Sequence, residues 1–276
     1  MRNTLKATTL ESKLPLLAVE HGCIISKDAD ITVAFEVSLP ELFTVTSAEY
    51  EAMHGAWCKA IKVLPHYSVV HKQDWFCSEK YQPELQKDDL SFLDRSFERH
   101  FNERPYLAHK CYLYLTKTTK ERMRQQSNFS TLCRGRITPK ELNHEMVVKF
   151  MESVEQFERI INDTGYIKLR RLSDDELVGT EKESGLIEKY MSLTMDDVTC
   201  LEDIDLDARQ MRIGDKMLCL HTLSDTDDLP AKVSTDNRYE RLSTDRSDCR
   251  LSFASPIGLL LPCNHIVNQY VLIDDH

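Results

Sequence analysis

Several features common in enzymes are missing from this 276-residue sequence. It has no Gly-Lys dipeptide, so the phosphate-binding loop Gly-x-x-x-x-Gly-Lys-Ser/Thr is absent. Geometry demands that loop, because bare backbone amides must surround the phosphates and a lysine must neutralise them. The GxSxG, HExxH and GxGxxG motifs are absent as well. We therefore expect no catalytic residues and no cofactor in this chain, although scattered Ser, His and Asp side chains that converge in space stay open.

Long apolar runs and paired cysteines are also lacking. The longest apolar run, Ile257–Leu261, is far shorter than the roughly 20 residues that cross a bilayer. The first residues carry charges and no signal-peptide core. Nine cysteines without a CxxC pair favour reduced thiols over a disulfide framework. Three Cys/His pairs lie one residue apart, but none has zinc-finger spacing, so we expect no metal site: His109/Cys111, Cys219/His221 and Cys263/His265.

Charge is unevenly distributed along the chain, whose formal net charge is −10. Residues 174–207 hold twelve acidic residues and two lysines, whereas residues 104–136 hold eight Lys/Arg and one Glu. An acidic whole argues against a general nucleic-acid binder, which normally has a basic footprint. The separation of an acidic from a basic segment favours oriented contact with a partner or with other copies of the chain. Two solvated faces that differ in sign are the alternative.

The first half of the chain alternates strand and helix patterns. Cys23–Ser26 and Ile31–Val37 predict a hairpin, and strands are expected over 67–76 and 111–115. Thr46 and Glu49 form a capping box before a helix that Pro65 ends. A second helix carries an apolar face of Leu90, Leu93, Phe97 and Phe101. The order ββαβαβ predicts helices packed on a sheet, with Trp57, Phe97, Phe101, Phe150 and Phe157 in the core.

The second half begins after a polar stretch at about 125–136, which we interpret as a linker between subdomains 1–124 and 137–276. A helix is expected from Thr138 to near Asn162, ended by a left-handed Gly165. A strand over 166–172, a turn capped by Ser173 and a helix over 184–193 should follow, then a hairpin near 213–215. The polar stretch near 224–250 predicts a mobile insertion. The fold class is α+β, with mixed or antiparallel sheets and two α/β subdomains as one arrangement.

A cluster of cations follows the strand predicted near Thr116, and it supplies the candidate partner-contact residues. Such a cluster can bind DNA phosphates, anionic lipid or an acidic protein surface. Tyr112 and Tyr114, on one strand face, would suit stacking with single-stranded nucleic acid if exposed. The net negative charge of the chain favours the alternative that a helix or a partner covers these tyrosines. The candidate residues are Lys117, Lys120, Arg122 and Arg124.

Two segments of the sequence resemble the front of a known family. Ser91–Arg136 runs from an amphipathic helix through Pro105 into a strand and the cation cluster, and Pro15–Val37 reads PLLAVEHGCIISKDADITVAFEV. Both resemble the TraG-type conjugation ATPases of Bacteroides-type conjugative transposons, the motors of a type IV secretion apparatus. The resemblance runs from about Leu10 to the last residue, and none of the family's catalytic motifs matches a position here.

The resemblance implies the non-catalytic N-terminal module of such a motor. It would be cytoplasmic, peripheral to the inner membrane, and docked on inner-membrane components of a conjugative secretion channel. Its other partners would be its own C-terminal motor domain and further copies in a homo-oligomer. Two alternatives stay open: a stand-alone adaptor without the motor, and a DNA- or anionic-lipid-binding module.

Overall fold

The computed structural model describes residues 9, 13–40, 45–81, 91–118, 144–196, 198–199, 201–207, 210–222 and 264–273. Two antiparallel sheets and several helices make up this part of the chain, which confirms the predicted α+β fold. No helix among these residues is long and apolar enough to cross a membrane. The cation positions 120–124, the linker 125–136 and the insertion 224–250 lie outside the described residues.

The main sheet has seven strands in the order β1-β2-β3-β5-β4-β10, and β6 pairs with the far half of β3. All its pairings are antiparallel, and β4 and β5 pair without a break from Ser68↔Lys117 to Lys80↔Pro105. The predicted strand 111–115 is thus part of the second half of a longer one. The strands are β1 (Leu16–Glu20), β2 (Cys23–Ser26), β3 (Ile31–Ser38), β4 (Ser68–Lys80), β5 (Pro105–Lys117), β6 (Lys168–Arg171) and β10 (His265–Ile273).

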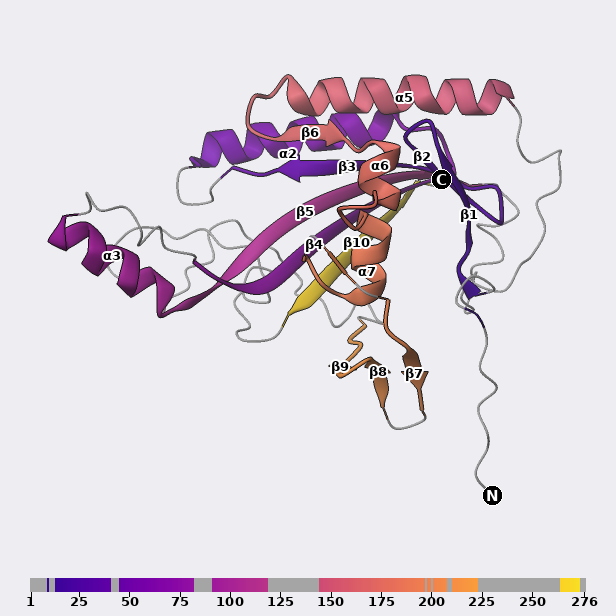
Figure 1. Ribbon diagram of the computed structural model, residues 1–276. Helices are drawn as coiled ribbons and strands as arrows, with labels where there is room; N and C mark the ends of the chain where they lie inside the picture. Colours follow the sequence, from indigo (N-terminus) through magenta and orange to yellow (C-terminus); the bar gives the residue numbers. More distant parts are fainter. Residues whose placement is uncertain are drawn as a thin grey trace.

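Helices cover both faces of the sheet (Figure 1). On one face, α2 (Ser47–Val63) and α5 (His144–Asn162) pack over β3 and β5 around Phe35, Leu113 and Phe157. On the other face, α6 (Asp174–Val178) and α7 (Leu186–Ser192) pack over a smaller core that contains Trp75. The short strands β7 (Ile204–Leu206), β8 (Met211–Ile213) and β9 (Lys216–Leu218) form a separate sheet.

Local signals in the sequence predicted most of these elements. Thr46 and Glu49 form the expected capping box of α2, and Ser173 caps α6. Gly165 follows α5 with φ +73°, as predicted for a left-handed end. The β2–β3 and β8–β9 hairpins are confirmed. Local patterns are enough here because each involves residues a few positions apart.

The predicted subdomains share the main sheet and the core beneath α2 and α5. β6 and β10 belong to the range 137–276, but they pair with β3 and β4 of the range 1–124. Phe157 of α5 lies in the same core cluster as Phe35 of β3 and Leu113 of β5. Hydrogen bonds and core packing therefore cross the predicted boundary, and the main sheet is built from both ranges.

The helix α3 (Phe92–Asn102) forms where predicted, but its apolar face is not in the core. It lies at the far end of the long β4–β5 pair, away from α2 and α5 (Figure 1). Phe97 and Phe101 are exposed, so their assignment to the core was wrong, whereas Phe150 and Phe157 are buried and Trp57 is partly buried as predicted. Helical periodicity identifies an apolar face without saying what covers it.

Candidate functional site

The helix α3 is fixed to the β4–β5 pair by its own cap and by aromatic contacts. Ser91 caps its start with Asp94 in a capping box. The ring of Tyr81, just after β4, meets the ring of Phe101 edge-on at 6.4 Å. The Tyr81 hydroxyl donates to Glu98 Oε1 at 3.1 Å. One end of α3 is thereby held in place while the rest projects beyond the sheet.

An apolar stripe on α3 faces solvent. Leu93, Phe97 and Phe101 recur every four residues and are 75%, 64% and 44% exposed; we call these three residues the α3 stripe. The rings of Phe97 and Phe101 lie 4.5 Å apart, which makes the stripe continuous. Fully burying such a side chain contributes about 1.5–3 kcal/mol. Contiguous exposed apolar surface of this kind marks interaction sites.

The charges on α3 are arranged around the stripe. Helical geometry places Asp94 and Glu98 on one flank, about 60° and about 100° from Phe97. Arg95 and Arg99 lie on the back of the helix, opposite the stripe. Two acidic and two basic side chains cancel, so α3 lacks the basic polar face of helices that bind anionic membranes. Asp94 on this flank complements an apolar protein surface bordered by Lys or Arg, whereas the Glu98 carboxylate is turned to Tyr81 and one of its oxygens is buried.

The candidate cation Lys117 lies in a different part of the fold and is turned inward. It is 8% exposed, its ammonium group donates to the carbonyl oxygen of His66, and it lies 5.4 Å from the centroid of the Tyr67 ring. Burial lowers the pKa of Lys117. Lys117 therefore presents no free ammonium group to a partner. Because Lys120, Arg122 and Arg124 lie outside the described residues, their role stays a prediction.

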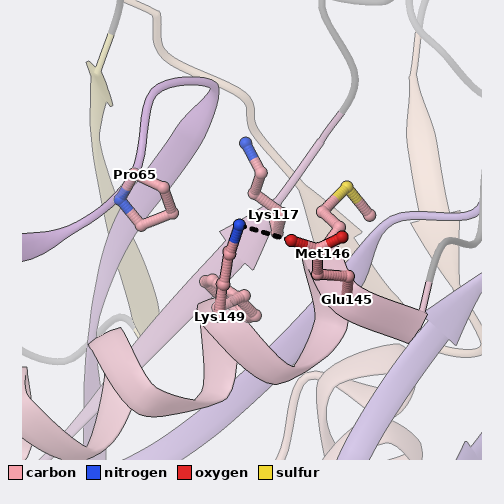
Figure 2. Close-up of a pocket in the computed structure, with 6 residues that line it drawn as sticks. Pro65, Lys117, Glu145, Met146 and Lys149 are labelled. Carbon is pink, nitrogen blue, oxygen red and sulfur yellow. Dashed lines mark hydrogen bonds and ion pairs between the residues drawn. The ribbon is translucent and has the colours of Figure 1, made fainter.

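A small cavity of about 290 Å³ opens beside Lys117 (Figure 2). It lies between the end of α2, the end of β5 and the start of α5. Glu145 Oε1 and Lys149 Nζ pair at 2.7 Å on one turn of α5, so their charges cancel at the rim. The polar groups of the cavity are these two side chains and Lys117, whose ammonium group is bonded to the His66 carbonyl oxygen. The lining residues of the cavity are Pro65, Lys117, Glu145, Met146, Lys149 and Phe150.

Tyr112 and Tyr114 pack against the core beneath α6 and α7. They lie on the face of β5 opposite Leu113, as the alternation predicted. Burial raises the pKa of Tyr112 to about 12 and that of Tyr114 further. The rings are covered by helices and offer no open platform for stacking bases.

A buried amide on β4 connects three strands through hydrogen bonds. Gln73 Oε1 accepts from the indole N–H of Trp75 at 2.7 Å and from the hydroxyl of Tyr114 at 2.9 Å. Because an indole only donates, the Gln73 amide nitrogen must face the other way. It donates to Asn268 Oδ1 of β10 at 2.9 Å, and His71 Nε2 lies 2.8 Å from the same oxygen. His71 therefore carries its proton on Nε2. No sequence motif signals this network.

Lowering the pH is expected to destabilise the protein through His71. Its ring is stacked between Tyr114 and Tyr270, at 5.0 and 4.3 Å, and burial lowers its pKa below 6.5 despite the bond to Asn268. As the pH falls below 6.5, the unfolded chain takes up the proton more readily than the folded one, so the free energy of unfolding decreases. Urea midpoints at pH 7.5 and 5.5 measure the change, and His71→Gln should flatten it. An unchanged slope in that variant contradicts the assignment.

A second titratable group lies on the opposite face of β4 and β5. Asp74 accepts from His109 Nε2 at 2.9 Å and pairs with Lys72. Burial opposes its ionisation, but these hydrogen bonds outweigh that effect and lower the pKa of Asp74. Burial also raises the pKa of the neighbouring Cys111 to about 12. A nucleophilic cysteine needs a lowered pKa, and burial shifts the pKa of Cys111 in the opposite direction.

The Cys/His pairs do not gather into a metal site in the part of the chain that the structure describes. Cys111 is buried on the strand that carries His109, whose ring stacks on Phe76 and bonds Asp74. Nowhere among the described residues do three His, Cys, Asp or Glu side chains come close enough to hold an ion. Cys263 lies outside the described residues.

Comparison with known proteins gives a match to a family model. Residues 3–55 match a family model described as a domain of unknown function, B. Theta Gene description (DUF3875). No curated protein matches the sequence. The matched range includes β1, β2 and β3, which lie at one side of the main sheet, and the first half of α2. This similarity covers about a fifth of the chain and names no activity.

Proposed function

We propose that this chain is the non-catalytic N-terminal module of a conjugative-transfer motor, and that it docks the motor on an inner-membrane protein of the secretion channel. The α3 stripe is the observation that carries the proposal. It presents Leu93, Phe97 and Phe101 to solvent at the end of a long strand pair. A surface held away from the core in this way suits capture of a partner. The resemblance to TraG-type motors supplies the identity of that partner.

The chemistry of the chain supports docking over catalysis. No phosphate-binding loop occurs in the sequence, and Cys111 beside Asp74 is held as a thiol. The motor domain that the resemblance implies would supply the nucleotide site. A protein partner is favoured over lipid, because α3 is electrically balanced and the chain carries a net charge of −10.

Removing the α3 stripe is expected to block transfer. The double substitution Leu93→Ser and Phe97→Ser takes away two anchors worth about 1.5–3 kcal/mol each when buried in a partner. A loss of about 3–6 kcal/mol corresponds to at least a hundredfold weaker docking. We expect the frequency of conjugal transfer from a donor carrying the variant to fall by at least tenfold. Thermal stability should change little, because both side chains are exposed.

The matched control is Phe92→Ser on the same helix. Phe92 is 85% exposed and lies about 140° around the helix from Phe97, outside the stripe. This variant should transfer at the normal frequency. Normal transfer with the double substitution, or an equal loss with Phe92→Ser, would refute the docking proposal.

A further inference from the structure

The outer edge of β10 is a second surface, distant in the strand order from β1 and separate from α3. β10 pairs with β4 along its whole length, from His265↔Phe76 to Ile273↔Ser68. Among the described residues, no strand pairs with its other edge. Tyr270, Val271 and Leu272 are exposed on this strand, Tyr270 by 62%. β10 therefore offers a row of main-chain groups and large side chains in register.

Among the residues that the structure describes, this edge lacks the features that normally protect a sheet edge. Edge strands are typically interrupted by a charge, a proline, a bulge or a covering segment. The nine residues of β10 contain no charged residue, no proline and no glycine, in a chain that is 29% charged. Its register with β4 has no shift. By contrast, β1, at the opposite end of the strand order, has a register shift after Leu16 and ends in Glu20.

A row of stacked rings ends at the same edge. Tyr114 of β5, His71 of β4 and Tyr270 of β10 face one another in register across three strands. Tyr270 is the outermost ring, and one of its faces rests on His71. An added strand would place a side chain against its other face, since directly opposed residues lie about 4.5–5.5 Å apart.

We propose that β10 pairs antiparallel with β10 of a second copy of this chain, so that two seven-stranded sheets join at this edge. With Tyr270 opposite its counterpart, residues 267–273 of each copy pair and the ring row continues across the two-fold axis. The strand is neutral, so two copies meet without like-charge repulsion at the contact although each chain is acidic. Antiparallel edge pairing closes after two copies and predicts a dimer, not a fibre.

The α3 stripe is a poorer surface for self-association. In an antiparallel pair of α3 helices the same flank of each copy faces the other. The Asp94 carboxylates of the two copies would then lie on the same side of the contact and repel each other. The geometry therefore assigns α3 to a different protein and β10 to a second copy, and the two surfaces can be tested separately.

Sedimentation of the full chain over about 1–100 µM tests the proposal. The wild-type chain should form a dimer, and Tyr270→Lys should weaken it at least tenfold by opposing two cations at the axis. Leu272→Lys should act in the same direction without removing the ring. The matched control is Leu17→Lys, an exposed apolar residue on the β1 edge; it should dimerise normally, as should Leu93→Ser/Phe97→Ser.

The register has its own test. In Tyr270→Cys the two new thiols face each other at the axis, so oxidation should link two chains much faster than in the wild type, which measures the background from native cysteines. A monomeric wild type at 100 µM overturns the proposal, and so does equal loss of dimer in Leu17→Lys. A dimer that survives both lysine substitutions at β10 also overturns it.

Discussion

Replacing Phe157 with alanine is expected to lower the free energy of unfolding by about 3–5 kcal/mol. Phe157 is fully buried on α5, and its ring meets Trp57 of α2 edge-on at 5.7 Å. The same cluster contains Phe35 and Leu113 of the sheet. Truncation removes apolar contact and leaves a cavity that a packed helix pair cannot close fully. Such a loss is large beside a typical total of about 5–15 kcal/mol.

Val148→Ala is the matched control, because Val148 lies on the same helix and is exposed. Urea unfolding followed by circular dichroism should show a change below about 0.5 kcal/mol for this variant. A loss below about 1 kcal/mol for Phe157→Ala would mean that α5 does not hold the sheet. The expected result would show that a helix of the range 137–276 stabilises strands of the range 1–124.

Replacing Gln73 with alanine is expected to lower the free energy of unfolding by about 2–4 kcal/mol. The side chain is 2% exposed and accepts two hydrogen bonds, from Trp75 and Tyr114, while donating one to Asn268. Truncation leaves the indole N–H and the tyrosine hydroxyl without their acceptor in a buried site. A buried group left unsatisfied costs about 1–3 kcal/mol.

Gln269→Ala is the control for this prediction, because Gln269 is an exposed glutamine on β10. It should change the urea midpoint little. The near-ultraviolet circular dichroism of Gln73→Ala should also change, since the Trp75 environment is altered. Equal effects of the two substitutions would show that the network does not stabilise the sheet.

The sequence predicted what depends on neighbours in the chain. Local patterns predicted helices and strands directly. The capping boxes of Thr46 with Glu49 and of Ser173 with Glu176 predicted helix starts, and the alternation through Leu113 predicted a strand. The pairing of β10 with β4 joins residues about 200 positions apart, and no local pattern encodes that partner. The same limit explains why two subdomains were expected, whereas the main sheet takes strands from both ranges.

The candidate site was predicted less well than the fold. The amphipathic pattern of α3 correctly gave its apolar face, but the environment of that face depends on where β4 and β5 carry the helix. Lys117 was grouped with its neighbours by charge, although the strand turns it toward the His66 carbonyl. Gln73 gave no signal, because a single glutamine in a strand shows neither its burial nor its partners.

The continuous β4–β5 pair has a mechanical consequence for the proposed docking role of α3. Thirteen residues at about 3.3 Å each make a lever of roughly 40 Å between α3 and the far end of the sheet. Both strands reach the end of the pair where α3 lies. A force that pulls on α3 therefore pulls β4 and β5 along their length, past their neighbours β3 and β10. The interstrand hydrogen bonds lie across that direction and are loaded in shear, many at once. The β4–β5 pair can thus transmit force into the sheet without its interstrand hydrogen bonds breaking one after another.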